Sequence, residues 1–116
     1  MHGMCDMQKS YKGTVIGESL ADGKVIAGMK VINSSVSSQL HWHLYTVEVT
    51  EEEIERLSHC INEKWYSHFW NGKEVIVAFK DKIFRFEHDK KETWKPAVDY
   101  GLSLGIPAEQ LDFPID

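Results

Sequence analysis

Apolar and aromatic positions are densest over residues 65–87, and two short polar interruptions divide this stretch into three runs. Asn71-Gly72 is the stronger interruption, because both central residues of a type I′ hairpin turn need a positive φ. Asp81-Lys82 is a second, weaker two-residue turn. The pattern therefore predicts an antiparallel meander with strands at Trp65–Trp70, Glu74–Phe79 and Lys82–Glu87.

The middle run of this meander differs from its neighbours in its pattern. Val75 to Phe79 is apolar at every position, whereas a strand with one solvated face alternates apolar and polar residues. Both faces of this strand should therefore be covered, which makes it the expected centre of the core. Weaker β-rich runs predict three further strands, at 11–16, 29–37 and 42–49, with a glycine-punctuated loop at 17–28.

Two helices are expected, one on each side of the meander in the sequence. The first follows a capping box in which Thr50 can accept from the third helical amide while Glu53 reaches back to the cap. Its apolar stripe predicts a helix that ends near Asn62. The second should run from Thr93, as N-cap, to Leu104, with Pro96 in the first turn and Gly105 just after the end.

These elements predict an α+β fold: a mostly antiparallel sheet of five to six strands, with two helices packed on one face. Residues 1–10 lack periodicity and read as a flexible tail, so 11–116 should form a single domain. The strand at 42–49, the first helix and the strand at 65–70 would form a right-handed crossover if those strands run parallel. Leu111 and Phe113 should fold back onto the core.

Charge and composition narrow the choice of partners. The 116 residues carry a net charge of -5, which disfavours nucleic acid or an anionic membrane as the main partner. The chain has no apolar run long enough for a membrane helix, and its first residues do not resemble a signal peptide. The two cysteines, Cys5 and Cys60, read as reduced thiols, so a cytoplasmic location is expected.

His41 and His43 are the candidate metal ligands. In a strand they would point to the same face, where two imidazoles can chelate one metal ion. With Glu48 they form the spacing H-x-H-x4-E, which resembles the first metal motif of the cupins over these eight residues. The cupin glycines are missing and a capped helix follows, so the alternative is two histidines at a solvated strand end, and no cofactor is predicted.

The candidate ligand-binding residues are aromatic. Tyr66, His68 and Trp70 share one face of a predicted strand, and Trp42 adds to an aromatic content that is high for this length. A histidine between aromatic residues can act as a general base or contact a ligand. It can equally be a core histidine bonded to a carbonyl, and most of the aromatic residues must serve the core.

The run WYSHFW-NGKEVIVAFKDKIF, followed by a tryptophan-bearing helix and GIPAEQLDFPI, resembles a family of small prokaryotic proteins of unknown function. The likeness covers about the last two-thirds of the chain. It implies a small cytoplasmic α+β domain and transfers no catalytic residue.

The sequence leaves two functions open, and it does not decide whether the protein is an enzyme. The first is a non-enzymatic binding or protein-interaction module, with a small molecule or a protein as its partner and a homodimer as one possible form. Such a module should carry an exposed apolar-aromatic patch. The second is a small enzyme or a ligand- or metal-binding protein that uses His41, His43 and His68, which requires these three side chains to converge.

Overall fold

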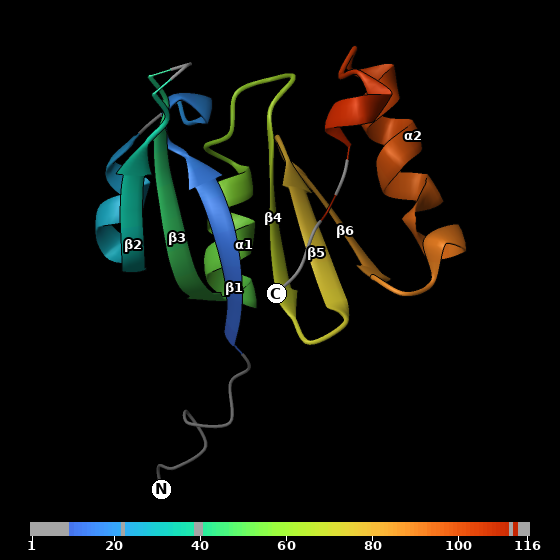
Figure 1. Cartoon of the computed structure of the whole chain (residues 1–116), viewed down its shortest axis with the longest axis horizontal. Helices are drawn as coiled ribbons and strands as arrows, with labels where there is room; N and C mark the ends of the chain where they lie inside the picture. The colour runs from blue at the N-terminus through green and yellow to red at the C-terminus, as the bar shows by residue number, and fades with distance from the viewer. Residues whose placement is uncertain (1–9, 22, 39–40, 112, 114–116) are drawn as a thin grey trace, which may run out of the picture.

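A computed structural model describes residues 10–21, 23–38, 41–111 and 113 (Figure 1). Six strands form one antiparallel sheet in the order β2-β3-β1-β4-β5-β6, which confirms the predicted α+β class. The expected tail at 1–10 falls largely outside the described residues, although Ser10 already belongs to β1. The strands are β1 (Ser10–Ile16), β2 (Lys30–Val36), β3 (His43–Thr50), β4 (Tyr66–Asn71), β5 (Glu74–Phe79) and β6 (Lys82–Glu87).

The β4–β5–β6 meander is confirmed, but both of its turns lie one residue away from the predicted positions. Asn71 pairs with Glu74, so the central residues of the first turn are Gly72 and Lys73. Only Gly72 has a positive φ, which is the requirement of a type II′ turn with glycine at its first central position. In the second turn, Asp81 adopts the positive φ.

β5 is buried on both faces, as its continuous apolar pattern predicts. Ile76 and Ala78 pack in one core cluster together with buried residues of the helix α1 (Glu51–Ser58). Val75, Val77 and Phe79 pack in a second cluster, which contains the helix α2 (Lys95–Ser103). Because successive strand residues point to opposite faces, the two helices lie on opposite faces of the sheet.

The prediction that both helices pack on one face is therefore wrong. The physical reason is already present in β5, because a strand that is apolar at every position needs a cover on each side. Two amphipathic helices on the same face would have left one apolar row of β5 in water. In Figure 1, α1 lies behind the sheet and α2 lies beyond β6, the last strand of the meander.

α1 begins as predicted and ends early. The Thr50 side chain accepts from the Glu53 amide, and the Glu53 carboxylate accepts from the Thr50 amide at 2.9 Å, which completes the capping box. The helix stops at Ser58 rather than near Asn62. Ile61 still lies in the core, but it reaches the core by pairing with Leu20 as an isolated bridge.

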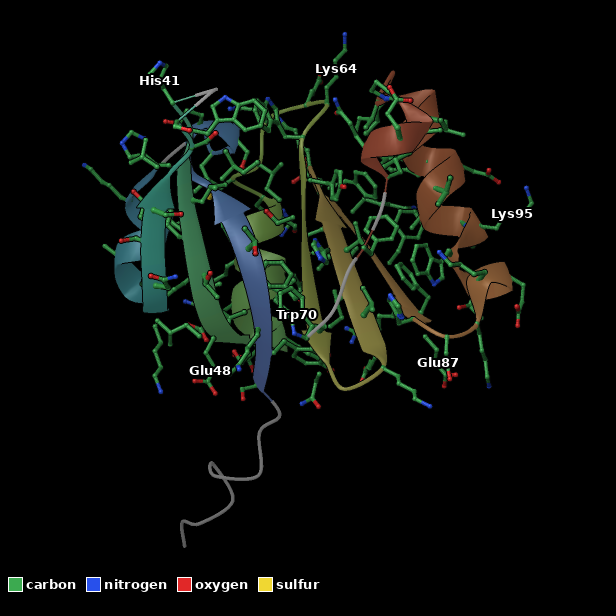
Figure 2. The ribbon with its side chains drawn as sticks, viewed as in Figure 1. His41, Glu48, Lys64, Trp70, Glu87 and Lys95 are labelled. Carbon is green, nitrogen blue, oxygen red and sulfur yellow. The ribbon has the colours of Figure 1, made fainter. Side chains whose placement is uncertain are left out.

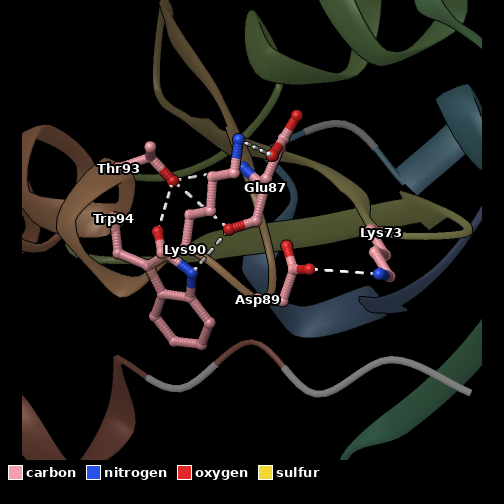
Figure 3. A network of polar contacts seen from close by, with 6 residues as sticks. All are labelled: Lys73, Glu87, Asp89, Lys90, Thr93 and Trp94. Carbon is pink, nitrogen blue, oxygen red and sulfur yellow. Dashed lines mark hydrogen bonds and ion pairs between the residues drawn. The ribbon is translucent and has the colours of Figure 1, made fainter.

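The start of α2 differs from the prediction that Thr93 is its N-cap. A short 3₁₀ turn, η4 (Lys91–Trp94), precedes the helix, and Trp94 occupies the cap position without a side-chain cap bond. The Thr93 hydroxyl is used elsewhere: it lies 2.6 Å from the Lys90 carbonyl, to which it donates, and accepts from the Glu87 amide (Figure 3). The Trp94 indole N–H donates to the Glu87 carbonyl at 3.1 Å, which ties the helix to the end of β6.

The connection from β3 through α1 to β4 joins two parallel strands, because each of them pairs antiparallel with β1. The predicted crossover thus has its parallel strands, although β1 lies between them. The fold therefore places β1 at the centre of the sheet.

Leu111 and Phe113 fold back onto the core cluster that contains α2 residues, as expected from their size and apolar character.

Candidate ligand pocket

The sheet is incomplete along its central seam. β1 and β4 pair only from Lys12–Trp70 to Thr14–His68, although both strands continue further toward the same end of the sheet. Continuing the register would place Val15 opposite Ser67 and Ile16 opposite Tyr66. These described residues form no such pairs, so the ladder ends and the strands separate there (Figure 1).

Gly13 explains why the two strands meet where they do. A Cβ atom at this position would lie 2.1 Å from Phe69 Cδ2 and 2.6 Å from the His68 carbonyl oxygen. Neither distance is compatible with a side chain, so the missing Cβ makes room for the Phe69 ring at the seam. The two halves of the sheet are thus joined through a short paired segment around one glycine.

A pocket of about 410 Å³ lies where the strands separate. This volume falls within the range of small-molecule sites, about 300–1,000 Å³. Its walls come from β1, β3 and β4, from the loops that precede β3 and β4, and from the segment after α2. The lining residues are Thr14, Ile16, Trp42, Leu44, Lys64, Trp65, Tyr66, Ser67, His68, Ile106 and Gln110.

Aromatic side chains form much of the wall. The rings of Trp42 and Trp65 meet edge to face, with centroids 5.1 Å apart and planes inclined by 64°. Tyr66 donates its hydroxyl proton to the Gln110 carbonyl, which fastens the segment after α2 against β4. Ile106 is buried in that segment. The wall is therefore largely apolar and is assembled from both ends of the chain.

Three of the four predicted ligand-binding residues line this pocket, namely Trp42, Tyr66 and His68. Trp70 lies one step further along the same face, with its ring centroid 5.3 Å from that of His68. The His68 ring also contacts Phe113, at 6.0 Å between centroids. His68 is therefore half-buried between the pocket and the aromatic cluster under α2.

Ser67 adds an unsatisfied polar group at the split, the place where β1 and β4 separate. Its hydroxyl oxygen is buried. Of the buried side-chain oxygen and nitrogen atoms in the described residues, this one alone has no hydrogen-bond partner. A buried polar group without a partner costs about 1–3 kcal/mol. Such a cost is unusual in a native fold, and here it falls on a residue that lines the pocket.

The structure does not bring the three candidate histidines together. His43 opens β3 on the face that carries the buried Val47 and Val49, which is the α1 face. His68 lies on the α2 face, opposite Val77. His41 precedes β3 and has a φ of 57°, so the alternation rule that placed it beside His43 does not apply to it.

His43 has a different partner. Its ring Nδ1 lies 2.6 Å from Glu18 Oε2, and its amide donates to Glu18 Oε1 at 2.8 Å. The hydrogen bond from the His43 side chain lowers the pKa of the Glu18 carboxyl below its ordinary value, and the His43 amide lowers it further. Both side chains are largely exposed, so this pair makes only a small contribution to stability.

Glu48, the third member of the cupin-like spacing, lies far from His41. Figure 2 shows them at opposite ends of the sheet. Glu48 instead forms an ion pair with Lys30 at 3.1 Å and accepts from Ser10. Within the described ranges, no three histidine, cysteine or acidic side chains are placed to hold a metal ion.

Sequence reasoning missed the rest of the lining. Ile16 and Leu44 read as ordinary strand residues, and Ile106 and Gln110 lie in a segment with no regular pattern. Gly13, in the middle of a predicted strand, was the available signal. An isolated glycine inside a strand often marks a close backbone approach, and here it marks the seam beside the pocket.

Comparison of this chain with protein-family models, with curated proteins and with solved structures found no match. The resemblance to a family of small prokaryotic proteins therefore stays a prediction. The functional argument has to start from the pocket.

Proposed function

We propose that this protein is a non-enzymatic binding module, and that the pocket between β1 and β4 takes a small, planar, mainly apolar ligand. The observation that carries the proposal is the aromatic-walled pocket at the point where the sheet separates. A flat aromatic compound matches it best, because aromatic rings pack favourably edge to face or offset against Trp42, Trp65 and Tyr66.

One polar group where β1 and β4 separate can orient such a ligand. Ser67 lines the pocket, and its hydroxyl is buried and has no hydrogen-bond partner among the described residues. A ligand that bonds to this hydroxyl would remove the cost of leaving it unpaired. A pocket that is mostly apolar, with a few directed polar groups, is the usual form of a small-molecule site.

We do not propose an enzyme that uses His41, His43 and His68 together, because His43 and His68 lie on opposite faces of the sheet. The partner is proposed to be a small molecule rather than nucleic acid or a membrane surface, in keeping with the net charge of -5. No helix in the described part of the chain is long and apolar enough to cross a membrane. A cytoplasmic site of action is proposed from the free thiol of Cys60.

Indole titrated into the protein and followed by NMR tests this function. We expect indole to shift the signals of Leu44, Ile106 and the Trp42 side chain at millimolar or lower concentration. Leu44→Arg places a long charged side chain in the wall and should abolish these shifts. Leu102→Arg, on the exposed surface of α2, is the matched control and should bind as the wild type does.

Two outcomes contradict the proposal. One is an indole titration that leaves the pocket signals unmoved up to its solubility limit. The other is an equal loss of binding in Leu44→Arg and in the Leu102→Arg control, since that would locate the binding elsewhere. Circular dichroism of both variants checks that they remain folded.

A further inference from the structure

The wall of the pocket between β1 and β4 carries ionisable side chains of one sign. Among its described lining residues, Lys64 and His68 can carry a positive charge and none is a carboxylate. The chain as a whole has 18 acidic residues against 13 lysines and arginines. The wall thus departs from the composition of the chain, and it favours an anion over a cation as the charged part of a ligand.

Lys64 stands in a turn that two backbone hydrogen bonds hold in place. The Asn62 amide donates to the Ser19 carbonyl at 2.7 Å, and the Trp65 amide donates to the Asn62 carbonyl at 3.3 Å. Lys64 has a φ of 69°, the left-handed conformation that a type II turn needs at its third residue. Glycine or asparagine usually fills this position, so the chemistry of the turn does not explain a lysine there.

The turn sets Lys64 beside the aromatic wall of the pocket. Trp65 follows it directly in the chain and meets the ring of Trp42 edge to face. Figure 2 shows Lys64 at the end of the sheet where β1 and β4 separate, with its side chain extending away from the strands. Because a lysine side chain is long and flexible, its ammonium can reach a ligand group at this exposed edge of the pocket.

The ammonium of Lys64 is not used by another part of the chain. Several other lysines pair with carboxylates, namely Lys30, Lys73, Lys90 and Lys95. None of the ion pairs within the described residues includes Lys64. His68, the other basic residue of the lining, already contacts the rings of Trp70 and Phe113. The positive charge that a ligand can use is therefore that of Lys64.

We propose that the ligand of this pocket is an aromatic carboxylate, whose ring packs against Trp42 and Trp65 and whose carboxylate accepts from the Lys64 ammonium. This inference rests on the proposed small-molecule function and adds the charge of the ligand to it. A carboxylate fits better than a phosphate, because one lysine supplies one positive charge, whereas phosphate sites combine several charged or backbone donors.

Three compounds with the same ring and different charges test the inference, namely indole, indole-3-acetate and tryptamine. In NMR titrations of the full chain at neutral pH, indole-3-acetate should bind at least about threefold more tightly than neutral indole, as expected for a partly exposed charge pair. Tryptamine, the cation, should bind more weakly than indole. This order opposes the general attraction of cations to a chain with a net charge of -5, so it has to arise in the pocket.

Lys64→Gln removes the charge with little change in side-chain length. It should bind indole as the wild type does and lose the preference for indole-3-acetate. Lys80→Gln should keep the full preference, because Lys80 is exposed at the turn between β5 and β6 and does not line the pocket.

The outcomes separate this inference from the function on which it rests. Equal binding of the three compounds, or tightest binding of tryptamine, overturns the aromatic carboxylate and leaves the small-molecule function standing. A preference for indole-3-acetate that survives in Lys64→Gln also overturns it, since the carboxylate would then bind elsewhere. If none of the three compounds binds, the proposed function fails together with the inference.

Discussion

The α2 face of the sheet has two halves, which differ in whether other elements cover them. Over β4, β5 and β6 this face is covered by α2 and the C-terminal segment, with a cluster of aromatic rings between them. Over β1, β3 and β2 the same face carries mostly polar side chains. Thr14, Thr46 and Glu48 on β1 and β3 are half-buried, and β2 is exposed throughout.

The difference lies in what each half has to bury. Strands of the covered half present aromatic and β-branched residues to both faces. In contrast, β1 alternates buried positions with exposed or half-buried ones, and β3 alternates buried and half-buried positions from Thr46 onward. The covered half therefore depends on the packing of α2, while the open half depends on α1 and the 3₁₀ segment η3 (Gly23–Gly28) behind it. The pocket lies where the two halves of the sheet separate, at the boundary between the covered and the open part of the α2 face.

The largest effect should come from the covered half. Trp94→Ala removes a buried ring that contacts Phe86 and Phe113 and also removes the indole hydrogen bond to β6. We expect a loss of about 3–5 kcal/mol in the free energy of unfolding, measured with urea. As a control, Thr46→Ala in the open half should cost less than about 1 kcal/mol. Comparable losses in both variants would contradict the contrast between the two halves.

The seam between the halves should be the next most sensitive place. Gly13→Ala puts a methyl group where Phe69 and the His68 carbonyl already lie, and we expect a cost of about 1–3 kcal/mol from overpacking. Gly23→Ala is the matched control, because a Cβ there meets nothing within 4 Å. It should be neutral or stabilising by up to about 1 kcal/mol. If Gly13→Ala is equally harmless, β1 and β4 do not depend on their close approach.

The sequence was informative wherever local pattern decides structure. The β-rich runs at 11–16 and 42–49, the capping box at Thr50 and the continuous apolar run of β5 each led to the observed element. The pattern of α2 itself did not give its position, because an amphipathic helix shows that it packs without showing on which face. The indication lay in β5, whose continuous apolar run needs a cover on each side. The lining of the pocket depends on which strands are neighbours, so only part of its aromatic wall could be predicted.

At the split itself, Ser67→Ala should be a small gain in the free protein. The change removes a buried hydroxyl without a partner, so we expect the free energy of unfolding to rise by up to about 1 kcal/mol. Ser58→Ala is the control: its hydroxyl donates to the Glu55 carbonyl at 2.6 Å, and its loss should destabilise. Destabilisation by Ser67→Ala would mean that this hydroxyl has a partner in solution.

The smallest effect should come from the exposed pair Glu18 and His43, behind the open half. The pKa of Glu18 is lowered, first by the hydrogen bond from the His43 ring and then by the bond from the His43 amide. A carboxyl with a lowered pKa stabilises the folded state above its unfolded pKa, and this contribution disappears as the pH falls through the folded pKa. His43→Ala removes the ring bond and keeps the amide, so the pKa of Glu18, followed by NMR, should rise part of the way to its ordinary value. Stability should change little, and only at acidic pH, since both groups are largely exposed. A pKa that does not move in His43→Ala would show that the amide alone holds the Glu18 carboxylate in solution.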